Sequence, residues 1–110
     1  MKKKYQNMIL CAAEMIGKIP RVNTLRETAT ASAYISAYND YAEACNYLGI
    51  ISAYVTKIEG AEKIVRKYKN RDGYDVENLK AMIEFYDEKI DDTYKDLKDF
   101  FDERQERQWR

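Results

Sequence analysis

Residues 76–100 read VENLKAMIEFYDEKIDDTYKDLKDF, and the spacing of their apolar positions decides the fold. One row of mostly apolar residues recurs at alternating intervals of three and four: Val76, Leu79, Ile83, Tyr86, Ile90, Thr93, Leu97 and Phe100. This pattern is typical of a helix that packs lengthwise against a partner helix. We predict a helix over about 76–107, roughly 45–50 Å long at 1.5 Å per residue. A rod of that length in a short chain needs a second rod beside it.

Residues before this helix are predicted to form the second long helix. A capping box, Thr24-Leu-Arg-Glu27, predicts a helix start, and the helical pattern continues to about Lys69. Its later half has a matching stripe, formed by Ala44, Tyr47, Ile51, Tyr54, Ile58, Ala61, Val65 and Tyr68. A glycine costs about 1 kcal/mol relative to alanine inside a helix. We therefore predict a helical segment over about 24–69 that is either one helix or two helices divided near Gly49 or Gly60.

A shorter helix is predicted over about 4–18, ending at Gly17 and Pro20. Its apolar face is formed by Met8, Cys11, Ala12, Met15, Ile16 and Ile19. Residues 70–73, Asn-Arg-Asp-Gly, predict the loop between the two long helices, with Asp75 capping the helix that follows. The sequence thus predicts a single all-α domain over residues 1–110. We expect a three- or four-helix bundle built on a long antiparallel helical hairpin, dimeric through exposed aromatic stripes.

Composition excludes several kinds of chemistry. The 110 residues include no histidine, four glycines and one proline, so histidine-dependent catalysis and a turn-rich β fold are not expected. Cys11 and Cys45 are far apart, and we interpret both as small buried hydrophobic residues. The apolar run over residues 8–13 is too short for a signal peptide, which predicts a cytoplasmic protein with no membrane contact. We expect no enzyme activity, no cofactor and no metal.

Charge is unevenly distributed in a chain whose 19 basic and 19 acidic residues cancel. Residues 1–26 hold six bases and one acid, whereas residues 76–103 hold ten acids and four bases. We interpret Lys2, Lys3 and Lys4 as a disordered, solubilising terminus. Direct binding to nucleic acid is not expected from this balance.

The acidic residues of the last helix are candidates for binding a protein partner: Glu84, Glu88, Asp91, Asp92, Asp99 and Asp102. Several like-charged pairs stand four residues apart, among them Glu84/Glu88 and Asp87/Asp91, and each costs a few tenths of a kcal/mol. Phe85 lies within this acidic region. One interpretation is a docking surface for a partner with a basic surface, anchored by Phe85. The other is a solvated helix face.

Tyrosine supplies a second candidate surface. Three of the ten tyrosines, Tyr34, Tyr38 and Tyr41, follow one helical face among small residues. Their rings suit stacking on a base or nucleotide, or the margin of a helical core.

One carboxylate pattern resembles an enzyme family. Glu59-x-x-Glu62 followed by Glu88-x-x-Asp91 is similar to the E-x-x-E…E-x-x-D motif of small all-helical nucleotide pyrophosphohydrolases of the MazG type. The resemblance implies a Mg²⁺ site between facing helices that bridges phosphate oxygens. The alternative is that these are surface carboxylates, because Glu88 and Asp91 lie outside the apolar stripe.

Taken together, these features favour a small non-enzymatic interaction protein. Short, charged chains rich in lysine, tyrosine and asparagine, without an enzyme motif, are typical of phage or mobile-element inhibitors. Such an inhibitor would block a host nucleic-acid-targeting complex in the manner of an anti-CRISPR protein. The alternatives are the MazG-like pyrophosphohydrolase and a dimer that binds a nucleotide between its tyrosines.

Overall fold

The computed structural model describes residues 1–19, 30–68 and 76–107, and almost all of these residues are helical. The three helices are α1 (Lys3–Gly17), α2 (Ala31–Tyr68) and α3 (Val76–Arg107). No described residue lies in a strand, so the predicted all-α class is confirmed. None of these helices has a stretch long and apolar enough to cross a membrane.

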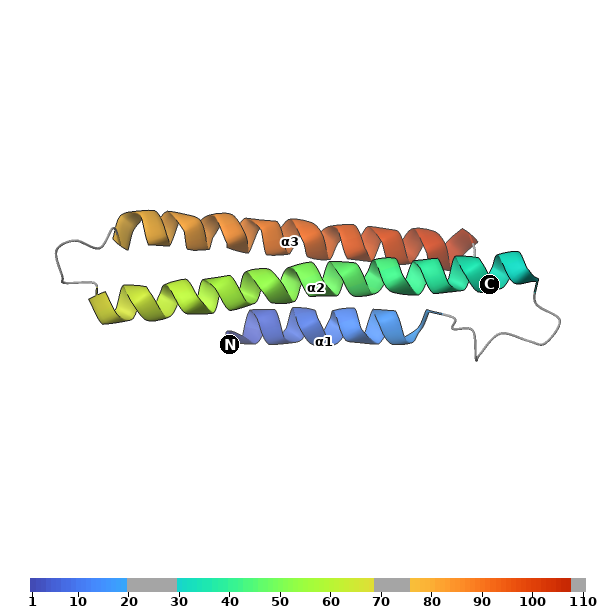
Figure 1. Ribbon diagram of the computed structural model, residues 1–110, viewed down its shortest axis with the longest axis horizontal. Coiled ribbons are helices and arrows are strands. Elements are labelled where there is room, and N and C mark those ends of the chain that lie inside the picture. The colour runs from blue at the N-terminus through green and yellow to red at the C-terminus, as the bar shows by residue number, and fades with distance from the viewer. Residues whose placement is uncertain (20–29, 69–75, 108–110) are drawn as a thin grey trace.

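The two long helices run antiparallel along each other, and α1 lies against them (Figure 1). The result is a rod with extents of 67 × 21 × 21 Å. Figure 1 shows α1 running in the same direction as α3 and opposite to α2. The amino-terminal end of α1 consequently lies beside the middle of α3, and this placement determines which acidic side chains α1 can reach.

The predicted stripe of α3 faces inward. Ile90 and Leu97 are completely buried, and Phe100 is nearly so. Complete burial of a branched apolar side chain contributes about 1.5–3 kcal/mol relative to exposure, so these positions hold α3 against its neighbours. The bounds of α3 agree with the predicted range of 76–107.

The helix α2 is continuous, so of the two alternatives the single helix is confirmed for residues 31–68. Neither Gly49 nor Gly60 interrupts the 38 residues of this helix. Ile51, Val55 and Ile58 between them are fully buried, and this packing outweighs the weak helix propensity of the two glycines.

The predicted start of α2 is wrong. The helix begins at Ala31 rather than near Thr24, and the Thr30 hydroxyl oxygen accepts a hydrogen bond from the backbone N–H of Ala33 at 3.2 Å. Threonine in this position satisfies one of the unpaired N–H groups of the first turn. The Thr24 capping box, Pro20, the 70–73 loop and Asp75 lie outside the described residues.

Side chains from all three helices form two core clusters. The first joins Ile16 of α1, Ala44 of α2 and Leu97 of α3, and the second joins Tyr5, Ile58 and Ile90. Cys11 and Cys45 belong to the edges of this packing. Cys11 is exposed and Cys45 half-buried, so the prediction that both cysteines are buried is wrong. Cys11 lies at the margin of the α1 face, where its thiol contacts Tyr94.

One buried ion pair ties the start of α2 to the end of α3. The carboxylate of Asp40 is 3.4 Å from Nε of Arg104, and Asp40 is only 5 % exposed. The Arg104 guanidinium also lies over the Phe100 ring, 5.3 Å from its centroid. Removing one member of a buried pair is costly, so this contact favours a single register between the two long helices.

Candidate interaction surface

The outward side of α3 carries a row of acidic residues around one aromatic ring. Phe85, Glu88, Asp92, Asp99 and Asp102 recur at intervals of three, four and seven, and all five are exposed. Helical periodicity places them opposite the buried Ile90 and Leu97. We call these five residues the acidic surface. They span about 21–26 Å along the helix axis at 1.5 Å per residue.

Phe85 is 52 % exposed within this surface. Its ring contacts Tyr86, with centroids 5.8 Å apart, and Lys89 Nζ lies 5.3 Å from its centroid. The four carboxylates of the acidic surface form no ion pair within the described part of the chain. Their charge is therefore available to an external cation. Glu84 is exposed at one margin of this surface.

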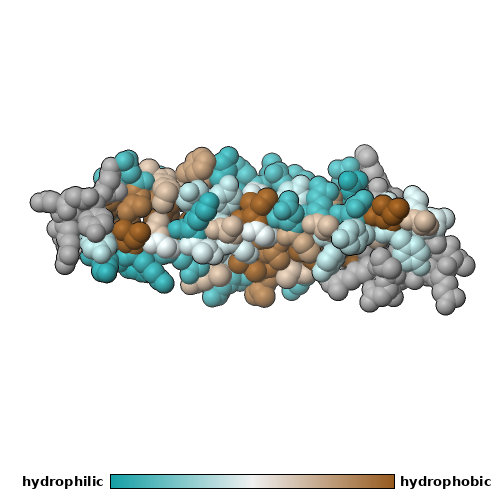
Figure 2. All heavy atoms as spheres, viewed as in Figure 1, coloured by the Kyte–Doolittle hydropathy of each residue, from teal (hydrophilic) through white to brown (hydrophobic). Residues whose placement is uncertain are grey.

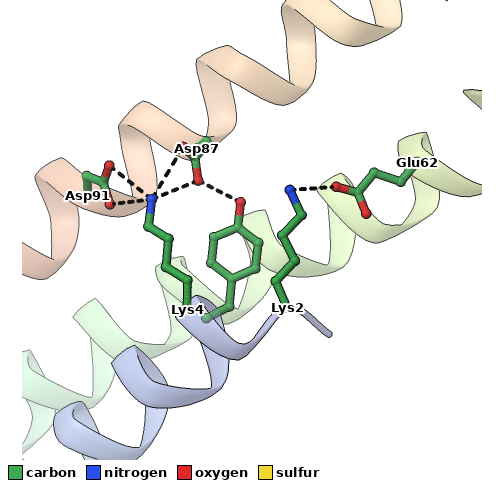
Figure 3. A network of polar contacts seen from close by, with 6 residues as sticks. Lys2, Lys4, Glu62, Asp87 and Asp91 are labelled. Carbon is green, nitrogen blue, oxygen red and sulfur yellow. Dashed lines mark hydrogen bonds and ion pairs between the residues drawn. The ribbon is translucent and has the colours of Figure 1, made fainter.

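Asp91 belongs to a different environment, although the sequence grouped it with Asp92. Lys4 of α1 reaches across to α3 and places its ammonium 3.2 Å from carboxylate oxygens of both Asp87 and Asp91 (Figure 3). The hydroxyl of Tyr5 donates a hydrogen bond of 2.6 Å to Asp87. Asp91 is thus part of the contact between α1 and α3.

These contacts shift the acid–base properties of the three partners. The hydrogen bond from Tyr5 holds the pKa of Asp87 below its usual value, and Lys4 adds to this effect. Burial and the Asp87 carboxylate raise the pKa of the Tyr5 phenol. Burial lowers the pKa of Lys4, but its bonds with Asp91 and Asp87 outweigh that effect and raise it overall. At neutral pH Tyr5 is therefore a neutral phenol, Asp87 a carboxylate and Lys4 an ammonium.

The basic start of the chain is ordered by acidic partners, so its interpretation as a disordered terminus is wrong. Lys2 lies 3.3 Å from Glu62 of α2, as Figure 3 shows, and the amino-terminal nitrogen of Met1 lies 4.0 Å from Glu59. The basic residues that begin the chain neutralise acids of both long helices. The uneven charge seen in the sequence is partly balanced within the molecule.

A second acidic feature adjoins the acidic surface and was missed from the sequence. A hollow of about 320 Å³ opens between α2 and α3, and Asp99 is on its rim. It is lined by Glu43, Tyr47, Asp96, Asp99, Phe100, Glu103 and Arg104. The Tyr47 and Phe100 rings form part of its wall, with centroids 5.9 Å apart.

The electrostatics of this hollow favour a cation. Burial raises the pKa of the Tyr47 phenol, and the nearby charges of Glu43 and Asp96 raise it further. Aromatic rings surrounded by carboxylates suit the side chain of a lysine or arginine. Glu43 and Asp96 are 53 positions apart in the chain. Only the antiparallel pairing of α2 with α3 brings them together, so no local sequence signal could have revealed this hollow.

The structure separates the three predicted tyrosines. Tyr38 is 65 % exposed, whereas Tyr41 packs at the edge of the first core cluster and Tyr34 is half-buried. They do not form one exposed stacking surface. Other tyrosines join the helix contacts: the Tyr54 and Tyr86 rings, for example, pack with centroids 5.3 Å apart.

The four carboxylates of the MazG-like pattern lie in different surroundings, and three of them have basic partners. Glu59 and Glu62 lie beside Met1 and Lys2, Asp91 pairs with Lys4, and Glu88 is exposed on the outward side of α3. Within the described ranges, no group of three acidic or cysteine side chains is close enough to hold a metal ion. Three of the four carboxylates, Glu59, Glu62 and Asp91, thus take part in ion pairs with the start of the chain.

Comparison with known proteins gives no family assignment. The chain matches no family model, no curated protein and no solved structure. The interpretation of its surfaces therefore depends on the geometry described above.

Proposed function

We propose that this chain is a non-enzymatic interaction protein that docks its acidic surface on a basic surface of a partner protein. The observation that carries the proposal is the row of four exposed carboxylates on the same side of α3 as the half-exposed Phe85, none of which forms an ion pair within the described residues. Charges of one sign steer a complementary partner, and a buried aromatic ring holds the complex once it has formed. The hollow beside Asp99 would receive a basic side chain of the same partner.

A basic groove that normally binds nucleic acid is the partner surface that fits best. A row of carboxylates along a straight helix presents spaced negative charges, as a nucleic-acid backbone does. The narrow form of the proposal is a phage or mobile-element inhibitor, anti-CRISPR-like, that occupies such a groove in a host nucleic-acid-targeting protein. The two free cysteines are consistent with action in the cytoplasm, a reducing compartment.

We further propose that the three helices form one bundle and that two bundles associate as a homodimer. The shared core clusters support the bundle. The aromatic pairs Tyr54–Tyr86 and Tyr47–Phe100 are already engaged between α2 and α3. The dimer contact must therefore involve other apolar residues.

The test begins with copurification of the tagged protein from its native host, followed by binding kinetics with the purified partner. Reversing Glu88, Asp92 and Asp99 to lysine should slow association and weaken its dependence on salt. Phe85→Ala should mainly speed dissociation, with a loss of about 2 kcal/mol in binding free energy. A matched control reverses Glu14, which is exposed on α1. If the acidic-surface variants bind the partner as the wild type and the control do, the proposal is wrong.

Incubation with a panel of nucleotides and Mg²⁺ tests the alternatives. Turnover that is lost when Glu59, Glu62, Glu88 and Asp91 are changed to their amides would favour the pyrophosphohydrolase. Tight binding without turnover would favour a nucleotide-binding dimer. We expect neither.

A further inference from the structure

The outward face of α2, directed away from α1 and α3, exposes large apolar side chains. Ile35 is 61 % exposed, Tyr38 65 %, Ile50 38 % and Ile64 39 %. They are spread along almost the whole helix. Ile35, Tyr38 and Ile64 lie on the side opposite the buried Ile51 and Ile58, and Ile50 lies at the edge of that side. In Figure 2, brown and pale residues run along the middle of the visible face, where Figure 1 places α2. Isolated exposed apolar residues are ordinary, but a row on one helix face indicates a contact.

This face carries no charged residue from Ile35 to Thr56, and its lysines begin at Lys57, at the angle of Asn39. Helical spacing places Ile35, Tyr38, Asn39, Ala42, Asn46, Gly49, Ile50, Ala53 and Thr56 on it in turn. A solvated helix face in a chain with 35 % charged residues would be expected to carry several charges over five turns. The outward face of α3 does so, whereas this face of α2 does not.

Two glycines on this face lack an explanation within the chain. A Cβ atom added at Gly49 or Gly60 would meet nothing within 4 Å. Each glycine costs about 1 kcal/mol relative to alanine in an exposed helix. Close approach of another backbone is the packing reason for which helices use small residues.

The residues of this face are arranged symmetrically about the Gly49–Ile50 bond. In an antiparallel pair of α2 helices centred there, Ile35 lies level with Ile64 of the partner copy. Asn46 then lies level with the partner copy's Ala53. The contact in which a surface faces its own copy is the isologous type found in two-fold dimers.

The charges beside this face complete the pattern. Glu43 and Lys57 are both exposed and lie on the same flank of α2, the flank nearer α3. A two-fold axis perpendicular to the plane of the two helices places the same flank of both copies on the same side of the dimer. Glu43 then lies beside Lys57 of the second copy, within about one residue along the helix axis. Lys57 already lies over the Tyr54 and Tyr86 rings, 5.6 and 5.4 Å from their centroids, which positions its ammonium on that flank.

We propose that a second copy of this chain covers the outward face of α2. The two α2 helices pack antiparallel around Gly49 and Ile50, and reciprocal Glu43–Lys57 pairs fix the register. This surface is on a different helix from the acidic surface, and the two proposals meet only at Glu43, which also lines the hollow beside Asp99.

Sedimentation velocity of the full chain over a concentration series tests the proposal, with circular dichroism to check that each variant stays helical. We expect the wild type to dimerise. Ile50→Arg places two arginines beside each other at the two-fold axis and should raise the dissociation constant at least about 30-fold. Leu10→Arg changes a similarly exposed apolar residue on α1 and is the matched control, which should remain dimeric.

A charge-swap experiment tests the register. Glu43→Lys and Lys57→Glu should each weaken the homodimer, because each places two like-charged contacts across the axis. An equimolar mixture of these two variants restores both opposite-charge contacts and should form a heterodimer about as stable as the wild type.

Several results would overturn the proposal. A wild type that stays monomeric at its highest soluble concentration would show that a second copy does not cover this face. A dimer that tolerates Ile50→Arg would use another surface. Failure of the mixed charge variants to associate better than either alone would reject the antiparallel register.

Reversal of Glu88, Asp92 and Asp99 should leave dimerisation unchanged. That result would support a dimer contact distinct from the acidic surface.

Discussion

Asp91 and Asp92 are adjacent in the sequence, yet they belong to two regions of α3 with opposite roles. Asp91, with Asp87 one turn before it, faces α1 and shares the ammonium of Lys4. Asp92 faces outward with Glu88 and forms no ion pair within the described residues. A rotation of 100° around the helix separates a carboxylate that holds the fold together from one that is free to bind.

The difference shows how one row of like charges can serve two purposes. Two carboxylates four residues apart repel each other in an isolated helix. A single lysine between Asp87 and Asp91 turns that pair into an attractive contact, whereas the Glu88–Asp92 pair keeps its repulsion. The repulsion between Glu88 and Asp92 lowers the stability of the free chain, and a basic partner would relieve that repulsion.

The largest expected effect on stability comes from placing a carboxylate on the buried side of α3, between its contact with α1 and its outward side. Ile90, one position before Asp91, is fully buried between the helices. Ile90→Asp should unfold the chain, because a buried unpaired charge costs several kcal/mol. Far-UV circular dichroism and thermal denaturation measure this directly. A folded, fully helical Ile90→Asp protein would contradict the assigned stripe.

A smaller effect is expected where α1 meets α3. Tyr5 is only 2 % exposed, and Tyr5→Phe removes the hydroxyl that donates to Asp87 while keeping the ring. We expect the free energy of unfolding to fall by about 1–2 kcal/mol, since hydrogen bonds to charged groups are worth more than neutral ones. Urea denaturation measures the loss. Tyr38→Phe, on an exposed ring of α2, is the control; equal losses in both variants would argue against a special role for the Tyr5–Asp87 bond.

The same region should also make stability depend on pH. Asp87 has a lowered pKa in the folded state, so its contribution is present above about pH 4 and is lost as the pH falls below that value. Tyr5 has a raised pKa, so its contribution is present below about pH 10 and is lost as the pH rises above it. Urea midpoints across this range should fall at both ends. Tyr5→Phe should flatten both falls, and an unchanged profile would contradict the network.

The smallest effect is expected on the outward side. Glu88→Gln removes repulsion with both Glu84 and Asp92, so stability should rise by a few tenths of a kcal/mol. Thermal denaturation at low salt resolves such a gain, and added salt should reduce it. A loss of stability would mean that Glu88 has a stabilising partner in the folded chain.

The helices were largely predictable because their signals are local. The alternation of three and four residues in α3 identified its inward face, and the buried Ile90 and Leu97 confirm it. The start of α2 at Ala31 differs from the prediction. Its continuity through Gly49 could not be decided from the sequence, because a glycine is a weak signal when burial on the opposite face decides the outcome.

The candidate site was only half predictable for a physical reason. The spacing of apolar residues indicates which residues of a helix lie outside the core, and it correctly placed Glu88 and Asp92 outside the apolar stripe. It cannot find which neighbouring helix an outward residue meets. Asp91 was therefore grouped with Asp92, Lys4 was interpreted as part of a disordered terminus, and the hollow containing Glu43 was missed, since each depends on contacts more than fifty residues apart.

The most direct test of this division of α3 is the free energy of unfolding of two variants, Asp87→Ala and Asp92→Ala, measured side by side in urea. Both changes replace aspartate by alanine in the same helix, so the gain in helix propensity cancels between them. The account predicts that Asp87→Ala is less stable than Asp92→Ala by about 1–2 kcal/mol, because only Asp87 loses bonds to Tyr5 and Lys4. Equal stabilities would contradict it, and would mean that the inward and outward carboxylates of α3 are equivalent.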